Sequence, residues 1–165
     1  MSKQYIVFTG VGKTYFCKHN LNWVDLDIGW WENTMQDAHA VSNLFYFYPR
    51  WGYNILIAGT VSSLRYIEYH KANLLMKLMP NFVPLKINII LPSIEMKEEM
   101  IARIAARGCA QDTRYLTQVY DKNWQALDNA KFDTKVYLKP GQYLSDIIDE
   151  NGEYKPGIDV IYGNK

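Results

Sequence analysis

The stretch Tyr5-Ile6-Val7-Phe8-Thr9-Gly10-Val11-Gly12-Lys13-Thr14 is an apolar run that ends in a glycine-rich turn and then Lys-Thr. The apolar run predicts a first β-strand, and residues 13–19 predict the helix that follows it. In the phosphate-binding pattern G-x-x-x-x-G-K-[ST], glycines let successive backbone N–H groups surround phosphate oxygens. The lysine of that pattern reaches the β- and γ-phosphates, and the hydroxyl binds Mg²⁺. The stretch therefore predicts a phosphate-binding loop between a strand and a helix.

The match to this pattern is incomplete at one position. Gly12-Lys13-Thr14 fits its end and Gly10 adds a further glycine, but the position of the first glycine is occupied by Val7. Either the loop is shorter than usual, or valine stands where glycine normally makes the tight turn. The alternative interpretation is an ordinary glycine-rich turn between a strand and a helix.

Composition limits the class of protein. The chain has 165 residues, which is enough for one domain with a substantial core. Its 18 Lys+Arg and 17 Asp+Glu give a net charge of +1, so we expect no nucleic-acid partner and only local anion binding. The two cysteines, Cys17 and Cys109, lack metal-site spacing, and we find no signal peptide and no run long enough to span a membrane. These features predict a reduced, cytoplasmic protein.

Strands and helices are predicted to alternate along the rest of the chain. After the first strand, we expect strands at residues 22–27, 53–58, 85–91 and 132–138. The expected helices begin at Thr34, after residues 59–62, at Ile94, at Asp112 or Thr113, and near Tyr143. This alternation favours a doubly wound parallel α/β sheet. Residues 158–162 are left open as an extra edge strand or a hairpin.

Apolar stripes are predicted on several of these helices. In the helix after residues 59–62, the stripe consists of Leu64, Ile67, Leu74, Leu75 and Leu78. In the helix of residues 94–107, it consists of Met100, Ile101, Ile104 and Ala105. Their three- and four-residue spacing predicts that they face the core.

Arg103 and Arg107 lie four residues apart on one expected helix, so both side chains project along one stripe. Two guanidinium groups that point the same way suit a polyphosphate, because arginine matches phosphate oxygens bidentately. The alternative is an exposed helix face that pairs with Glu98 or Glu99. With a phosphate-binding loop upstream, we favour phosphate binding, since phosphoryl transfer depends on neutralising charge.

Asp25 and Asp27 lie at the carboxyl end of the expected second strand, the edge where open α/β sheets bind ligands. Either could hold Mg²⁺ through water or take a proton from an acceptor, and the alternative is a structural cap for the next turn. His19, His39 and His70 show no metal or catalytic-triad pattern, so we interpret them as surface or core residues.

Four further residues lie in or beside the helices after strands two and three: Trp30, Trp31, Arg50 and Arg65. An acceptor could be held there by the arginines while its base stacks on the tryptophans. Each of the four, taken singly, has a structural role as its alternative.

With these segments in order, the chain resembles the small P-loop nucleoside-monophosphate kinases, in particular the compact nucleotide kinases of bacteriophages. The resemblance is carried by residues 10–15, 24–27, 97–99, 103–108, 123–124 and 137–146, which lie within residues 5–150. It implies a three-layer α/β/α P-loop NTPase fold with a five-stranded parallel sheet in the order 2-3-1-4-5. It also implies one kinase domain at residues 1–150, with an acceptor-binding segment at about 28–52 and a lid at about 94–114, and then a tail at 151–165.

The resemblance also implies a reaction. ATP would be the phosphoryl donor, Mg²⁺ the metal, and a nucleoside monophosphate, in particular a deoxynucleoside monophosphate, the acceptor. The product would be the diphosphate. We expect no nucleic-acid or membrane partner, a monomer or homodimer, and a cytoplasmic location, which is the host cytoplasm if a phage encodes the protein. The rival hypotheses are a P-loop kinase for a nucleoside or a sugar, and a nucleotide-binding module that has lost catalysis.

Roles for individual residues follow from the resemblance. ATP binding is assigned to Gly10, Val11, Gly12, Lys13, Thr14 and Tyr15. Catalytic roles are assigned to Lys13, Asp27, Arg103 and Arg107, and metal binding to Thr14 and Asp27. Acceptor binding is assigned to Asp25, Trp30, Trp31, Arg50 and Arg65. Because the third strand ends in Ala58-Gly59-Thr60 without an acidic residue, Mg²⁺ must rely on Thr14, water, and Asp25 or Asp27.

Overall fold

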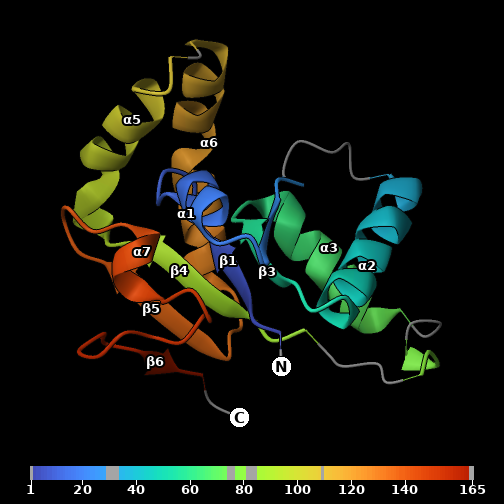
Figure 1. Cartoon of the computed structure of the whole chain (residues 1–165). Helices are drawn as coiled ribbons and strands as arrows, with labels where there is room; N and C mark the ends of the chain where they lie inside the picture. The colour runs from blue at the N-terminus through green and yellow to red at the C-terminus, as the bar shows by residue number, and fades with distance from the viewer. Residues whose placement is uncertain (1, 29–33, 74–76, 81–84, 109, 164–165) are drawn as a thin grey trace.

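A computed structural model of the chain describes residues 2–28, 34–73, 77–80, 85–108 and 110–163. Its strands are β1 (Gln4–Val7), β2 (Trp23–Leu26), β3 (Asn54–Ala58), β4 (Asn88–Pro92), β5 (Thr134–Leu138) and β6 (Ile161–Tyr162). Among the described residues they form one six-stranded sheet in the order β2-β3-β1-β4-β5-β6 (Figure 1). Strands β1 to β5 are parallel, and β6 is antiparallel to β5. The predicted α/β fold with a largely parallel sheet is confirmed.

The predicted count of five wholly parallel strands is wrong. In the tail, Ile161 pairs with Lys135 and Tyr162 with Thr134, which adds an antiparallel strand beside β5. An edge strand exposes unpaired backbone groups, and a short apolar segment that returns along that edge satisfies some of them.

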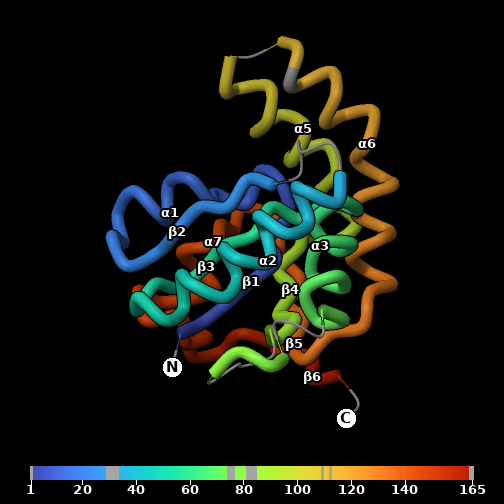
Figure 2. Tube along the Cα trace, turned by 90° about the vertical axis from the view of Figure 1, so that its right-hand side faces the viewer, coloured from blue at the N-terminus to red at the C-terminus, as the bar shows by residue number. Residues whose placement is uncertain are grey.

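Helices cover both faces of the sheet. They are α1 (Lys13–His19), α2 (Met35–Arg50), α3 (Val61–Ala72), α5 (Lys97–Ala105), α6 (Ala110–Asn129) and α7 (Leu144–Ile147), and a 3₁₀ turn (Ile94–Met96) leads into α5. Helix α3 packs against both α2 and α6, and α1 contacts α7. Figure 2 shows α3 and α6 on one side of the sheet and α1 and α7 on the other.

The helix ends follow local capping chemistry. As predicted, Thr34 caps α2: its hydroxyl accepts a 3.1 Å hydrogen bond from the Asp37 N–H, and the Asp37 carboxylate accepts one from the Thr34 N–H. Thr60 caps α3 in a similar way through the Ser63 N–H. Side chains that bind these first N–H groups fix where a helix begins.

Two predicted apolar stripes need correction. Helix α3 ends at Ala72, and Leu78 lies beyond it with 81% of its surface exposed. Leu74 and Leu75 fall outside the described residues. On α5, Met100 and Ile104 are buried as predicted, but Ala105 is exposed because it lies in the last turn, away from the sheet.

The centre of the sheet is the core. Every residue of β3 and β4 is buried, as expected for parallel strands covered on both faces.

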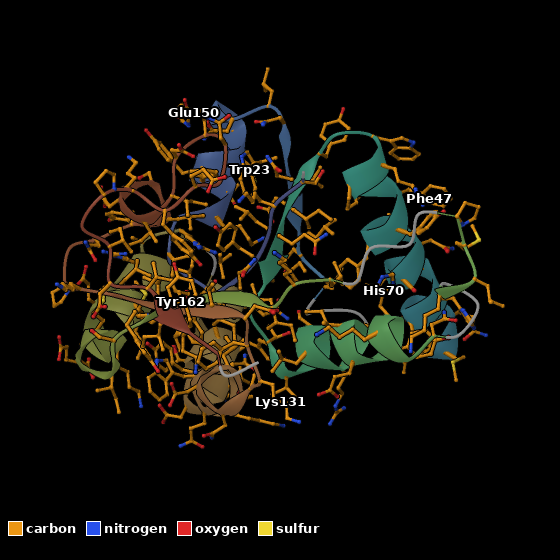
Figure 3. The ribbon with its side chains drawn as sticks, turned by 90° about the horizontal axis from the view of Figure 1, so that it is seen from below. Trp23, Phe47, His70, Lys131, Glu150 and Tyr162 are labelled. Carbon is orange, nitrogen blue, oxygen red and sulfur yellow. The ribbon has the colours of Figure 1, made fainter. Side chains whose placement is uncertain are left out.

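The C-terminal tail is hydrogen-bonded to the N-terminal part of the chain: the Tyr5 hydroxyl donates to the Gly152 carbonyl at 2.8 Å, and Trp23 Nε1 donates to the Glu150 carbonyl at 2.8 Å (Figure 3). Because β1, β2 and β3 are parallel, the loops that follow them lie at one edge of the sheet.

No helix within the described residues is both long and apolar enough to cross a membrane.

Candidate active site

The glycine turn, residues 8–12, joins β1 to α1. Val7 is the last residue of β1 and is fully buried, so it belongs to the strand, and the loop is the shorter form. Gly10 and Gly12 have φ of +93° and +98°, a region that favours glycine. Gly12 caps α1, and its carbonyl accepts a 2.9 Å hydrogen bond from the Phe16 N–H. The backbone of this turn therefore requires the glycines that the sequence provides.

Side chains from two distant segments pack around the turn. Met100 of α5 lies next to Gly10, where an added Cβ would be 3.5 Å from its Sδ atom. Tyr143 lies over Gly12, where an added Cβ would be 3.4 Å from its Cδ1 atom. The Val11 carbonyl accepts a 2.8 Å hydrogen bond from the Leu144 N–H of α7. The turn is thus held between α5 and the segment that follows β5.

Lys13 and Thr14, the first two residues of α1, share one acidic partner. The Lys13 ammonium forms an ion pair with Asp25 Oδ1, and the Thr14 hydroxyl donates to Asp25 Oδ2 at 2.9 Å. Only 13% of the Lys13 side chain and 23% of the Asp25 side chain are exposed. Burial lowers the pKa of Lys13, the negative charge of Asp27 opposes that shift, and the positive charge of Arg107 adds to it.

Asp27 has a different setting from Asp25. It lies just past the end of β2, is exposed, and faces a pocket at the edge of the sheet. The lining of this first pocket comes from the glycine turn, α1, the ends of β2 and β3, the segment after α5, and α6: Phe8, Thr9, Gly10, Lys13, Thr14, Asp27, Ala58, Thr60, Arg107, Tyr115 and Leu116. A lysine, a hydroxyl, a carboxylate and an arginine therefore meet around one space.

A second pocket adjoins the first, because Gly10, Thr14 and Arg107 line both. Its lining is completed by Gly12, Tyr15, Lys18, Arg103, Ala106 and Tyr143. Tyr15 has 64% of its surface exposed, and its ring lies 4.1 Å from that of His19. This pocket combines the outer face of the glycine turn with aromatic and cationic side chains.

The two predicted arginines differ in their surroundings. Arg103 forms an ion pair with Glu99, donates from Nη1 to the Gln142 carbonyl at 2.9 Å, and lies 3.8 Å from the centre of the Tyr143 ring. Its pairing with Glu99 was the alternative considered for this helix, although Arg103 also lines the second pocket. Helix α5 ends at Ala105, so Arg107 lies in the turn after it, and the two arginines do not share one helix as predicted. Arg107 is exposed and lines both pockets. Arg107 is therefore the arginine available to a ligand.

Among the predicted acceptor-binding residues that the structure describes, Arg50 and Arg65 do not lie at the two pockets. Arg50 donates to the Pro80 carbonyl and stacks 3.9 Å from the Tyr46 ring centre. The Ser2 hydroxyl donates to the Pro49 carbonyl at 3.0 Å, so this end of α2 lies near the start of β1, away from the glycine turn. Arg65 is exposed on α3 and, like Arg50, lines neither of the two pockets. Trp30 and Trp31 lie outside the described residues.

Thr60, Tyr115 and Tyr143 are among the pocket residues to which the sequence alone assigned no role. Thr60 and Tyr143 follow β3 and β5, and the rule that ligands bind at the carboxyl ends of parallel strands would have indicated both. Tyr115 of α6 had no such signal, because its place depends on how α6 crosses the edge of the sheet.

The oxygen donors near Thr14 are compatible with magnesium. Among the described residues, no three His, Cys, Asp or Glu side chains form a cluster that could hold a metal ion by themselves. Magnesium usually keeps several waters and is bound by one or two carboxylates together with substrate phosphates. The Thr14 hydroxyl with Asp25 and Asp27 supplies that kind of partial site beside Lys13.

Comparison with known proteins does not define a family. No protein-family model and no curated protein matches the chain. A solved structure with similarity is a chain from "Structure of the Pnkp1/Rnl/Hen1 RNA repair complex", at 17% sequence identity and a TM-score of 0.43. The match covers 77% of this chain and 45% of that one.

Proposed function

We propose that the protein is a P-loop kinase that transfers the γ-phosphoryl group of ATP, with Mg²⁺, to a nucleoside monophosphate. We further propose that the acceptor is a deoxynucleoside monophosphate. The observation that carries the proposal is that Lys13, Thr14, Asp27 and Arg107 line one pocket directly beside a turn with two glycines at positive φ. Phosphoryl transfer requires mainly positioning and charge neutralisation, and these are the groups that provide them.

In this proposal, the donor nucleotide occupies the second pocket. Backbone N–H groups of the glycine turn would bind its phosphates, as they do in a phosphate-binding loop. Lys13 would move to the β- and γ-phosphates, and the Arg103–Tyr143 stack beside Gly12 would offer the base a flat surface. The turn and the stack lie in the same pocket, which supports one ligand that spans both.

The first pocket would hold the reacting groups. Thr14 would bind Mg²⁺, with Asp25 and Asp27 close by. The metal would offset charge on the transferring phosphoryl group. Arg107 reaches both pockets, so its guanidinium could stabilise that group between donor and acceptor. Burial of the Lys13 side chain would strengthen its interaction with a phosphate, because it excludes water.

A second candidate is a P-loop kinase that acts on the hydroxyl of a nucleoside or a sugar. Two observations favour it. Asp27 is exposed in the first pocket, whereas Arg50 and Arg65 lie outside that pocket. A phosphate acceptor needs cations of its own, whereas a hydroxyl acceptor needs a carboxylate that can take its proton.

An acceptor panel tests both candidates. Purified protein with Mg-ATP would be offered the common nucleoside monophosphates, their deoxy forms, nucleosides and simple sugars, and ADP production would be followed. Diphosphates made from monophosphates support the first candidate, and turnover with only nucleosides or sugars supports the second. ATP binding without transfer to any acceptor would contradict both and favour a module that has lost catalysis.

A further inference from the structure

Asp25 holds the two side chains that the proposed donor site depends on. One carboxylate oxygen faces the Lys13 ammonium, and the other accepts the Thr14 hydroxyl hydrogen at 2.9 Å. Neither interaction involves Asp27, which faces the first pocket instead. In this structure, Asp25 thus binds both Lys13, the proposed phosphate ligand, and the hydroxyl of Thr14, the proposed metal ligand.

This arrangement has to change when a nucleotide binds. If Lys13 moves to the phosphates, Asp25 loses the cation that balances its charge. Its side chain is only 23% exposed, and a carboxylate with little access to water is costly to leave without a counter-charge. Thr14 is bonded to the same carboxylate, so a cation bound at Thr14 would replace the lost charge.

We propose that Asp25 is a positioning residue that exchanges Lys13 for the metal, and so makes ATP binding depend on Mg²⁺. This inference rests on the proposed function. Without the metal, ATP must break the Lys13–Asp25 ion pair with no compensation. With the metal, the same step is compensated, and the two ligands are coupled through one carboxylate.

The end of β3 explains why this residue lies on β2. The segment after Ile57 reads Ala58-Gly59-Thr60, and an added Cβ at Gly59 would lie 2.9 Å from the Val7 carbonyl oxygen. No side chain larger than hydrogen fits there without movement. Position 59 therefore cannot supply an acidic group near Thr14, and Asp25 of β2 supplies one instead.

The experiment compares how tightly a non-hydrolysable ATP analogue binds with Mg²⁺ and with EDTA, by calorimetry, in wild type, Asp25→Asn and Asp121→Asn. In Asp25→Asn, binding without metal should tighten about tenfold or more, because loss of a charge-assisted contact frees Lys13. The gain from Mg²⁺ should shrink by a similar factor. Asp121→Asn makes the same substitution in the Lys97–Asp121 ion pair, which lines neither pocket, so it should leave that gain within about threefold of wild type.

A second variant keeps the test independent of how well Asp25→Asn folds. Thr14→Val retains the Lys13–Asp25 ion pair but removes the hydroxyl for the metal, so it should lose the Mg²⁺ gain while metal-free binding stays near wild type. Thermal unfolding checks the fold of each variant.

The outcomes separate the two proposals. Equal effects of Asp25→Asn and Asp121→Asn, or an unchanged Mg²⁺ gain in Asp25→Asn or Thr14→Val, would overturn the exchange while leaving the kinase proposal intact. Failure of the wild-type protein to bind the nucleotide with or without Mg²⁺ would overturn both.

Discussion

Arg103, on α5, and Arg107, just past the end of that helix, show how two identical residues four apart can have different roles. Arg103 has 11% of its side chain exposed and is bound by Glu99, by the Gln142 carbonyl and by the Tyr143 ring. Arg107 is exposed and faces both pockets. The first therefore contributes to the structure around the glycine turn, and the second is available for chemistry.

We predict that Arg103→Ala lowers the free energy of unfolding by about 1 to 3 kcal/mol, since it leaves partly buried partners without a donor. Arg107→Ala should leave stability nearly unchanged but lower turnover at least about tenfold, because it removes charge stabilisation at the reacting group. Denaturant unfolding and steady-state kinetics on the two variants check this contrast. The reverse pattern, with a destabilised but fully active Arg107→Ala, would contradict it.

Gly12 is constrained by its backbone conformation and by the side chain that packs against it. Its φ is +98°, and a Cβ there would contact Tyr143 at 3.4 Å. Gly52 is a matched control, because it has φ of +84° but nothing within 4 Å of an added Cβ. We expect both Gly12→Ala and Gly52→Ala to lose about 1 to 2 kcal/mol of stability through backbone strain. Only Gly12→Ala should also weaken binding of an ATP analogue, measured by calorimetry; equal binding in the two variants would contradict a role for the turn.

Helices α2 and α3 are joined by a buried polar contact. Ser42 Oγ on α2 lies 2.7 Å from His70 Nδ1 on α3, and both residues are almost completely buried (Figure 3 labels His70). Burial lowers the pKa of His70 from 6.5 to about 4. The imidazole is therefore neutral in the folded protein over a pH range where the unfolded chain binds a proton.

This difference in proton binding between the folded and the unfolded chain makes the stability depend on pH. Between pH 6.5 and about 4, the unfolded chain binds more protons than the folded protein, so stability falls as the pH falls. We predict that the free energy of unfolding is highest above pH 6.5 and decreases toward pH 4 by a few kcal/mol.

The measurement is urea unfolding of wild type and His70→Gln at several pH values. The variant should be less stable near neutral pH but flatter between pH 6.5 and 4, because it lacks the titrating group. His19→Asn, at an exposed histidine, should keep the wild-type profile. A profile for His70→Gln as steep as that of wild type would contradict the assignment.

At the scale of the whole molecule, the sequence predicted correctly those features that depend on neighbouring residues in the chain. The bounds of α1 and the Thr34 cap were predicted correctly, because glycine, lysine and threonine have strong positional preferences. The buried run of β3 was equally clear. Strand β6 was left open, because a two-residue pairing is decided by the nearby edge of β5 and not by its own pattern.

The candidate site was predictable to a smaller extent. Lys13, Thr14, Asp27 and Arg107 meet in one pocket, as expected from loops that share one edge of the sheet. Sequence could not separate Asp25 from Asp27, because residues two apart in a strand share a face. What separates them is that β2 ends at Leu26, which leaves Asp25 against α1 and Asp27 beyond the strand.

The measurement that tests the central claim most directly is ADP production from Mg-ATP with a panel of nucleoside and deoxynucleoside monophosphates, for wild type and Lys13→Ala. We predict turnover by wild type with one or more monophosphates, and a loss of at least about 100-fold in Lys13→Ala with the fold retained, since Thr14 still pairs with Asp25. Normal turnover in Lys13→Ala, or no turnover by wild type with any monophosphate, would contradict the account.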